Sequence, residues 1–510
     1  MSTISTPPDL PSVQPWDEHN QRWVGHVRPV GWRNPQPAGR YNLLVVGAGP
    51  AGLVAAIGAA GLGAKVALVE KHLLGGDCLN VGCVPSKALI AAGRRAAAVR
   101  DAAAFGVRVP DGVEVDFPAV MQRLRRLRAD MSAHDSAERF TSLGVDVFLG
   151  DGRFTGRGRF EVDGREISFA RACIATGARA AAPPIPGLAE IEYLTNETVF
   201  TLTALPRRLG VIGAGPIGCE LAQAFRRFGS EVHLVESMHG ILPREEPASA
   251  EIVRRSLERD GVTICCCGRK PRLAADGDAI RLVFESHDTG YDIALDALLI
   301  AVGRAPNVEG LGLDAAGVKF DARGITVDDR LRTTNPRIFA AGDVASKYQF
   351  THAADFLARI VIGNALFFGR SKASALTIPW ATYTEPELAH VGMTARELDE
   401  NNITYRTYEV PLAEVDRAVL DGETEGLVTI HADRKGRILG ATIVAAHAGD
   451  LIGEVSLAMT NGLRLGDVAR TIHPYPTQGE AIRKIGDLFN RSRLTPLVQS
   501  ALGRLLRWRR

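Results

Sequence analysis

The chain has 510 residues, 46% of them hydrophobic, and its 60 Lys and Arg residues nearly balance 58 Asp and Glu residues. This length predicts about three domains of roughly 150 residues each, and the small net charge of +2 gives no electrostatic reason to expect nucleic acid as a partner. No apolar run approaches the ~20 residues needed to span a bilayer, and residues 1–40 lack the apolar core of a signal peptide. We therefore expect a cytoplasmic protein, and the 7 thinly spread cysteines do not indicate a secreted disulfide framework.

Residues 1–40 are interpreted as an extension, and a β-α-β unit follows them. A short apolar strand over 41–46 leads into a glycine-rich turn, an Ala-rich helix to Leu62 and a second strand over 65–70. In a G-x-G-x-x-G turn the glycines allow a tight turn, close approach of a pyrophosphate, and close packing of helix on strand. The turn residues are Gly47, Gly49, Pro50, Ala51 and Gly52, and the acid expected to hold a ribose hydroxyl is Glu70.

The same unit recurs downstream, with strands over 208–212 and 231–236 and a helix over 219–228. Its turn contains Gly213, Gly215, Pro216, Ile217 and Gly218, and its acid is Glu236. Two such units argue against coincidence, so we expect two dinucleotide-binding domains. The carboxylate of Glu236 repels the 2′-phosphate of NADP, which predicts NADH as the nucleotide, although Arg244 leaves NADPH possible.

The remaining pattern defines the fold class. A charged helical stretch over 119–142 and short strands over 145–174 separate the two units, and Thr- and Val-rich strands over 427–430 and 438–444 follow residue 375. We expect an α/β protein with two doubly wound, Rossmann-like dinucleotide-binding domains plus a C-terminal α+β domain.

Cys78 and Cys83 lie five residues apart in the segment 75–87. In a regular helix this spacing corresponds to about 7.5 Å of rise and roughly 140° of rotation. A disulfide needs Cα atoms within about 6.8 Å, so a bridge would require a distorted segment, for which Gly82 and Pro85 offer places. A close pair in a reducing compartment is more often catalytic or metal-binding. Zinc is disfavoured because no second Cys/His pair accompanies it, and two unrelated buried thiols stay as the alternative.

The segment 75–87 closely resembles the redox motif of the class I pyridine nucleotide–disulfide oxidoreductases, which include dihydrolipoamide dehydrogenase, glutathione reductase and mercuric reductase. The resemblance covers about residues 41–490 and includes 175–177, 301–307 and 339–344. It implies FAD and a nicotinamide nucleotide as cofactors, with Cys83 facing the flavin and Cys78 exchanging electrons with a substrate. It also implies a buried ion pair between Lys87 and Glu220, and a homodimer formed through the third domain.

The resemblance further implies cofactor contacts and domain boundaries. Besides the two glycine turns, the expected cofactor contacts are Glu70, Lys71, Gly76, Asp77, Lys87, Gly152, Thr176, Gly177, Ala178 and Asp343 for FAD, and Glu220, Glu236 and Gly303 for the nicotinamide nucleotide. The expected boundaries are 1–40 for the extension, 41–190 and 306–375 for the FAD domain, 191–305 for the NAD(P) domain, 376–490 for the dimerisation domain and 491–510 for a tail.

The C-terminal motif departs from the disulfide-reducing members of the family, which carry His-Pro-Thr-x-x-Glu. Alignment on Pro-Thr-x-x-Glu places Tyr475 at the acid/base position and Glu480 at the orienting position. Because a phenol has a pKa near 10 against ~6.5 for imidazole, Tyr475 is a poor base for dihydrolipoamide or glutathione chemistry. His473, two residues earlier, is interpreted as a surface or structural residue.

Mercuric reductase resembles this chain in its tyrosines. It has a Tyr at the position of Tyr475 and a second Tyr after Pro-x-x-Pro-Gly-Leu, which here is Tyr193. Its C-terminal cysteine pair and N-terminal heavy-metal domain have no match in this sequence. The leading hypothesis is a mercuric reductase-like enzyme that passes electrons to a small-molecule acceptor. The alternatives are dihydrolipoamide dehydrogenase and, in another class, a flavin-bound redox sensor.

Two further segments carry expectations. Cys265, Cys266 and Cys267 are soft metal ligands, but an apparent strand there would turn alternate side chains into the core, so no metal site is predicted. The basic tail has leucines at near-helical spacing. It is expected to form a helix that packs on the dimer or makes weak contact with an anionic membrane surface.

Overall fold

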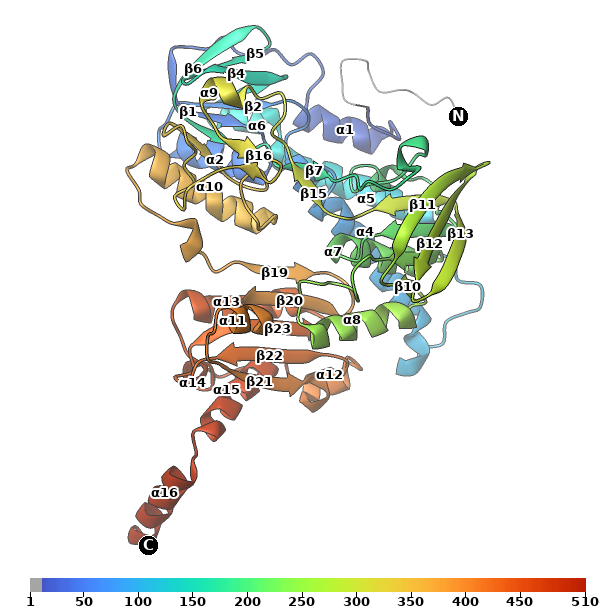
Figure 1. Cartoon of the computed structure of the whole chain (residues 1–510), viewed down its shortest axis with the longest axis vertical. Helices are drawn as coiled ribbons and strands as arrows, with labels where there is room; N and C mark the ends of the chain where they lie inside the picture. The colour runs from blue at the N-terminus through green and yellow to red at the C-terminus, as the bar shows by residue number, and fades with distance from the viewer. Residues whose placement is uncertain (1–11) are drawn as a thin grey trace. The chain divides into compact units, whose positions relative to one another are not determined.

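The computed structural model describes residues 12–510 (Figure 1). It divides into two compact units, each described by itself. The first contains residues up to Gly213, Ala224–His233 and Arg269–Ala375; the second contains Ala214–Gln223, Leu234–Gly268 and Leu376–Arg510.

The first unit is built on a seven-stranded sheet in the order β3-β2-β1-β6-β5-β4, with β18 paired to β6. Strands β1, β2, β3, β6 and β18 run parallel to one another, whereas β5 pairs antiparallel with β6 and with β4. The bounds are Arg40–Val46 for β1, Val66–Glu70 for β2, Val145–Leu149 for β3, Gly152–Gly156 for β4, Arg159–Val162 for β5, Arg165–Ile174 for β6 and Ile338–Ala340 for β18. Helices α2 (Pro50–Gly61) and α10 (Thr351–Leu366) pack side by side.

The expected N-terminal extension contains a helix, α1 (Glu18–Val27). The side chain of Asp17 accepts the backbone N–H of Asn20 at 2.9 Å and caps the helix. Trp23 and Val27 are 4% and 0% exposed, and α1 packs against α5 (Phe117–Ser132). The described part of the extension is therefore an integral piece of the first unit.

The helical stretch predicted over 119–142 is interrupted. After α5 and a short turn, α6 (Ala137–Ser142) starts anew because Ser136 is extended and its hydroxyl accepts the N–H of Arg139 at 3.3 Å. Helices α3 (Gly76–Asn80) and α4 (Cys83–Arg100) lie between β2 and α5 in the chain.

A second Rossmann-like sheet has the strand order β10-β9-β8-β14. Its bounds are Arg208–Ile212 for β8, Glu231–Val235 for β9, Thr263–Cys265 for β10 and Ala297–Ile300 for β14, and its helices are α7 (Pro216–Phe228) and α8 (Pro247–Arg259). An antiparallel sheet of β11 (Arg269–Asp276), β12 (Ala279–Ser286) and β13 (Thr289–Leu295) lies between β10 and β14 in sequence. Strands β7 (Ala178–Ala180) and β15 (Arg304–Pro306) pair antiparallel, as do β16 (Phe320–Asp321) and β17 (Gly324–Ile325), and α9 spans Leu313–Ala316.

The second unit contains a five-stranded antiparallel sheet in the order β19-β20-β23-β22-β21. Its strands are β19 (Pro379–Thr382), β20 (Glu387–Gly392), β21 (Arg406–Pro411), β22 (Leu427–Ala432) and β23 (Ile438–Ala445). Helix α13 (Ala448–Thr460) packs on β20 and β23, and α15 (Glu480–Ser492) packs on β21. Short helices α11 (Ala395–Glu400), α12 (Asp416–Leu420) and α14 (Leu465–Val468) complete this α+β arrangement (Figure 1).

The predicted tail is helix α16 (Pro496–Trp508), capped by Thr495. None of its side chains is buried. Across residues 12–510, no helix has both the length and the apolar character required to cross a membrane.

Candidate active site

The residues predicted to contact FAD follow the carboxyl ends of neighbouring parallel strands. The first glycine turn follows β1, Glu70 ends β2, Thr176 and Gly177 follow β6, and Asp343 follows β18. Carboxyl ends of parallel strands meet at one edge of a sheet, where ligands bind in such folds. The topology thus brings four separate sequence segments to one edge.

The first glycine turn has the form that a dinucleotide pyrophosphate requires. Gly47 has φ of +100°, and a Cβ there would lie 2.4 Å from the carbonyl oxygen of Ala175. A Cβ on Gly52 would lie 1.8 Å from the oxygen of Gly47. Neither position has room for a side chain. A phosphate could therefore approach the N-terminus of α2 closely, where the backbone N–H groups and the helix dipole favour it.

Glu70 is a buried acid that shapes the same turn. Its Oε2 accepts the N–H of Ala48 at 2.7 Å, and its Oε1 accepts the N–H of His72 at 2.7 Å. Burial raises the pKa of Glu70, against these hydrogen bonds, which lower it. The neighbouring Lys71 is exposed. The carboxylate position at the end of β2 fits the ribose-binding acid of this class of fold.

Arg304 links two of the predicted FAD residues. Its Nη2 donates to the Asp77 carboxylate and, at 2.8 Å, to the oxygen of Ala178, and its Nε lies 3.4 Å from Asp343. Burial raises the pKa of Asp343 to about 6, against the lowering effect of Arg304. Sequence reasoning did not select Arg304, although it lies within the quoted match over 301–307.

The two cysteines lie on different helices. Helix α3 ends at Asn80 and α4 begins at Cys83, so the segment between the cysteines is not a regular helix, while the disulfide itself stays a prediction. Gly82 lies in the break, where an added Cβ would be 2.7 Å from the oxygen of Asp77. Both cysteines are thiols here, with Cys78 half-buried and Cys83 exposed.

The environments of the two thiols differ. Cys83 is the first residue of α4, where the helix dipole favours a thiolate, and its Sγ lies 3.5 Å from the Oγ1 of Thr351. A hydrogen bond with Cys83 raises the pKa of Cys78, and burial raises it further. These surroundings favour the proton on Cys78 over the proton on Cys83.

The N-terminal helix supports this cysteine segment through Asn80. Trp23 Nε1 donates to Asn80 Oδ1 at 2.9 Å, and Arg128 Nη1 donates to the Asn80 backbone oxygen at 2.8 Å. Asn80 Nδ2 in turn donates to the oxygens of Leu73 and Leu74 at 3.2 and 3.1 Å. Sequence reasoning missed these residues, because no local pattern links residue 23 to residue 80.

The other predicted residues of the first unit are more dispersed. Lys87 is half-buried on α4, and Tyr193 is half-buried before β8. Gly76 has φ of +56°, and its Cβ would lie 2.5 Å from the Cα of Gly49. At Gly152 a Cβ would lie 2.3 Å from the ring of Phe160, so a side chain does not fit there, and its contact with FAD stays a prediction.

The second glycine turn repeats the first. Gly213 has φ of +105° and a Cβ there would lie 2.5 Å from the oxygen of Ala301, while Gly215 faces open space. Glu236 Oε2 accepts the N–H of Ala214 at 2.8 Å, as Glu70 does at the first turn. Pro216 and Ile217 are exposed at the start of α7, Gly218 is buried, and Gly303 is exposed with φ of +136°.

Glu220 is buried on α7 and accepts the N–H of Tyr383 at 2.8 Å. It belongs to the second unit, whereas Lys87 belongs to the first. Their ion pair stays a prediction.

The C-terminal candidates lie in the second unit. Tyr475 is 71% exposed, and its hydroxyl donates to Asp416 Oδ2 at 2.8 Å, a hydrogen bond that raises the pKa of Tyr475. Glu480 opens α15 and accepts Arg483 Nη2 at 3.0 Å, while its Oε2 is buried with no hydrogen-bond partner among residues 12–510. His473 Nε2 lies 2.9 Å from Glu454, and its Nδ1 lies 3.0 Å from the oxygen of Thr471. Because Thr471 and Glu454 already engage both ring nitrogens of His473, neither nitrogen is available to exchange a proton with an electron-accepting substrate.

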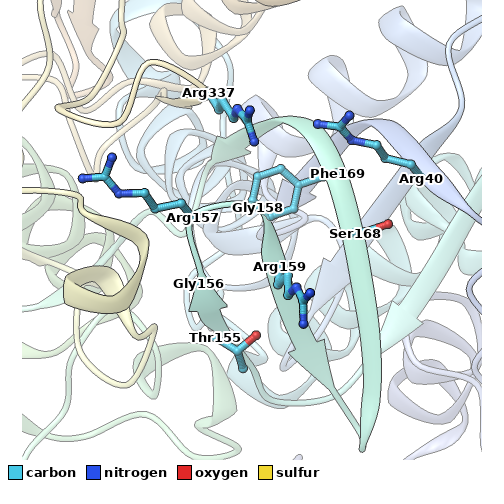
Figure 2. Close-up of a pocket in the computed structure, with 9 residues that line it drawn as sticks. All are labelled: Arg40, Thr155, Gly156, Arg157, Gly158, Arg159, Ser168, Phe169 and Arg337. Atoms are coloured by element: carbon cyan, nitrogen blue, oxygen red, sulfur yellow. The ribbon is translucent and has the colours of Figure 1, made fainter.

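A cavity of about 500 Å³ lies apart from these residues, along β4, β5 and β6 (Figure 2). Four arginines surround it, which are Arg40, Arg157, Arg159 and Arg337. None of the residues predicted for redox chemistry lines this cavity.

Two dinucleotide turns, one after β1 and one after β8, and a cysteine pair on α3 and α4 indicate a dinucleotide-binding redox protein. Residues 41–356 match the pyridine nucleotide-disulphide oxidoreductase family, and residues 378–485 match its dimerisation domain. The chain belongs to this family of FAD-dependent enzymes, which use a pyridine nucleotide.

Known proteins of two activities resemble the chain. A mercuric reductase of Bacillus cereus is 36% identical over 445 residues, covering 87% of this chain and 70% of that protein. A dihydrolipoyl dehydrogenase of Bacillus subtilis is 36% identical over 447 residues, covering 86% of this chain and 94% of that protein.

Solved structures show the same fold. The HOCl-induced flavoprotein disulfide reductase RclA from Escherichia coli has a TM-score of 0.77 at 28% identity, covering 88% of this chain and 100% of that chain. LpdA from Mycobacterium tuberculosis has a TM-score of 0.80 at 28% identity, covering 88% of this chain and 99% of that chain. The expected fold class is confirmed.

Proposed function

We propose that this enzyme passes electrons from NADH through FAD to the Cys78–Cys83 pair and on to a small thiophilic acceptor, as mercuric reductase does. The observation that carries the proposal is the pair itself. Cys83 begins α4, and Cys78 lies across the break from it with its pKa raised by the hydrogen bond to Cys83. This asymmetry suits a redox pair in which one sulfur holds charge and the other meets the acceptor.

The flavin, when bound, supplies the exchange between hydride transfer and thiol chemistry. Glu70 and the N-terminus of α2 would hold its ribose and pyrophosphate. Asp343, which lies 3.4 Å from Arg304, would contact the flavin nucleotide at the same edge of the sheet. Glu236 and the second turn would hold the nicotinamide nucleotide in the same way.

The cysteines complete the electron transfer. Reduction of a Cys78–Cys83 disulfide takes two electrons and one proton and leaves a thiol on Cys78 and a thiolate on Cys83. The N-terminus of α4 stabilises the thiolate. Re-formation of the S–S bond passes two electrons to the acceptor and releases the proton.

Tyr475 supports a metal-ion acceptor over a disulfide. Its hydrogen bond to Asp416 raises the pKa of its phenol, so it stays protonated at neutral pH and does not serve as a base. A disulfide acceptor needs a proton for its leaving thiolate, and a phenol with a raised pKa is a weaker acid than the thiol it would form, whereas reduction of a thiophilic cation has no leaving thiol to protonate. This departure from the family's histidine favours the second kind of acceptor.

Dihydrolipoamide dehydrogenase activity is the second candidate. A relative of that name is as similar to the chain as the mercuric reductase is and is covered over more of its length, 94% against 70%. The orphaned Oε2 of Glu480 offers a partner for a proton-transfer group.

An acceptor screen tests the proposal. The purified holoenzyme is given NADH and, in separate assays, Hg²⁺ with excess thiol, lipoamide and glutathione disulfide. We expect the highest kcat/KM with Hg²⁺. Faster turnover with lipoamide would contradict the proposal in favour of the second candidate, and slow turnover with every acceptor would favour a redox sensor.

A further inference from the structure

Three soft donor groups gather in the second unit, apart from the cysteine pair of the first. They are the side chains of His239, Cys266 and Cys267, whose ligand atoms lie within 4.8 Å of one another. The Nδ1 of His239 is 3.3 Å from the Sγ of Cys267. Cys266 and Cys267 are half-buried and His239 is exposed, so an ion from solvent could reach the group.

The expectation that all three consecutive cysteines lie in a strand is wrong. Strand β10 ends at Cys265, which is buried, and the chain then turns away from the sheet. Cys267 has φ of +58°, a left-handed conformation that is uncommon outside glycine and persists where its surroundings fix it. The turn leaves the thiols of Cys266 and Cys267 beside His239 and leaves Cys265 in the core.

Backbone hydrogen bonds fix the two segments that carry these donors. The N–H of Cys267 donates to the oxygen of Met238 at 3.0 Å, and the N–H of Gly268 donates to the oxygen of Glu236 at 2.8 Å. The N–H of Glu236 in turn donates to the oxygen of Cys265 at 2.9 Å. The donors are therefore held together by the fold rather than by flexible side chains alone.

We propose that His239, Cys266 and Cys267 form a binding site for a thiophilic d¹⁰ cation such as Zn²⁺ or Cd²⁺. One imidazole and two thiolates are preferred ligands of such ions, which take four in a tetrahedron. A tetrahedral ion would take its fourth ligand from outside these three residues. Thiols bind as thiolates, so each bound ion displaces the protons of the two cysteines.

The site adjoins the loop behind Glu236. The carboxylate of Glu236 also accepts the N–H of Met238 at 2.9 Å, one residue before His239. An ion that ties His239 to Cys267 restricts this loop and holds Glu236 for the nucleotide. This consequence rests on the proposed role of Glu236, whereas the metal site itself does not.

The test uses the full-length holoenzyme with Cys78→Ser and Cys83→Ser, kept reduced, so that the active-site thiols bind no metal. Zn²⁺ is titrated against a competing chromophoric chelator, and Cd²⁺ binding is followed by the thiolate-to-metal absorption in a difference spectrum. We expect one ion per chain, with release of up to two protons. Cys266→Ser with Cys267→Ser should abolish the binding, and His239→Ala should weaken it.

Cys265→Ala is the matched control, because Cys265 adjoins the group but is buried in β10. It should bind the ion as the parent does. Binding that survives the loss of Cys266 and Cys267, or the absence of stoichiometric binding in the parent, would overturn the site. Equal flavin content and thermal stability of the variants would show that they are folded.

A second measurement addresses the nucleotide. In the same background, the dissociation constant of NAD⁺, which does not reduce the flavin, should fall when Cd²⁺ is bound, and this change should disappear in the Cys266→Ser, Cys267→Ser variant. An unchanged dissociation constant would overturn the link to Glu236. Since no turnover is measured, failure here is distinguishable from failure of the proposed redox function.

Discussion

At the residue scale, we predict that Glu236 governs the choice of nucleotide. Its buried carboxylate is fixed by the N–H groups of Ala214 and Met238, so it cannot easily move away from a 2′-phosphate. We expect kcat/KM for NADH to exceed that for NADPH by at least about tenfold, or ~1.4 kcal/mol. Steady-state kinetics with both nucleotides measure this ratio, and Arg244→Ala, an exposed change, shows whether that arginine contributes to the use of NADPH. A tenfold advantage for NADPH would reverse the prediction.

His390 makes stability depend on pH. The ring is fully buried on β20, with Nδ1 2.8 Å from Thr442 Oγ1, and burial lowers its pKa to about 4. In the unfolded chain the pKa is about 6.5, so below that pH the unfolded state binds a proton that the folded state does not. Stability from this group is complete above about pH 6.5 and falls towards pH 4, by up to about 3 kcal/mol.

Thermal unfolding of His390→Gln between about pH 7 and pH 5 tests this effect. The variant should lose less stability than the parent as the pH falls, whereas His134→Gln, at an exposed position, should follow the parent. Equal pH dependence of His390→Gln and the parent would contradict the assignment.

The sequence predicted the residues of local motifs well and those of distant contacts poorly. Glu70 and Glu236 follow from spacing within one β-α-β unit, and each accepts an N–H group of its glycine turn, while their contacts with ribose stay predictions. Arg304 instead donates a hydrogen bond to Asp77, which is 227 residues away in the sequence. Trp23 donates one to Asn80, which is 57 residues away. Such contacts depend on tertiary packing, which no periodic pattern encodes.

At the element scale, the residues at which helices and strands end were harder to predict than the elements themselves. A distortion between Cys78 and Cys83 was expected at Gly82 or Pro85, and the break lies at Gly82 while Pro85 is inside α4. The end of β10 at Cys265 was not expected. The sequence around Cys265, Cys266 and Cys267 is the same whether the strand continues through all three cysteines or ends at the first. Only the pairing of residues 265–268 with 236–238 distinguishes them.

Helix α16 carries a prediction of its own. Its side chains are not buried, and Leu497 and Trp508 are 84% and 82% exposed among basic residues. An exposed basic amphipathic helix binds anionic lipid surfaces, with ~1 kcal/mol per charge near the lipid. We expect the full chain, but not a chain ending at residue 493, to cosediment with anionic liposomes and to leave neutral ones unbound. Equal behaviour of both forms would restrict the helix to packing within the dimer.

At the scale of the whole molecule, the family's dimerisation domain supports a homodimer. We propose that Tyr475 and Glu480 complete the cysteine site of the partner subunit. A mixture of inactive Cys78→Ser with an inactive Tyr475→Phe, Glu480→Gln variant should then regain partial activity after subunit exchange, since one site of each heterodimer carries no substitution. Each variant alone is the control. A monomer in sedimentation at working concentration would contradict this arrangement.

The fold class followed from two repeated units and a change of pattern after residue 375. The sheet edge that collects Glu70, Thr176 and Asp343 could be inferred from the rule for parallel strands. The metal site proposed at His239 and Cys267 could not be inferred from the sequence. These residues are 28 positions apart, and their contact depends on the turn at Cys267.

The absorption spectrum of the NADH-reduced enzyme tests the central claim most directly. If electrons reach the Cys78–Cys83 pair and Cys83 holds the thiolate beside the flavin, reduction produces a long-wavelength thiolate-to-flavin band. Cys78→Ser, which leaves the Cys83 thiolate, should retain the band, and Cys83→Ser should abolish it. Retention of the band in Cys83→Ser, or its absence from the reduced parent, would contradict the account.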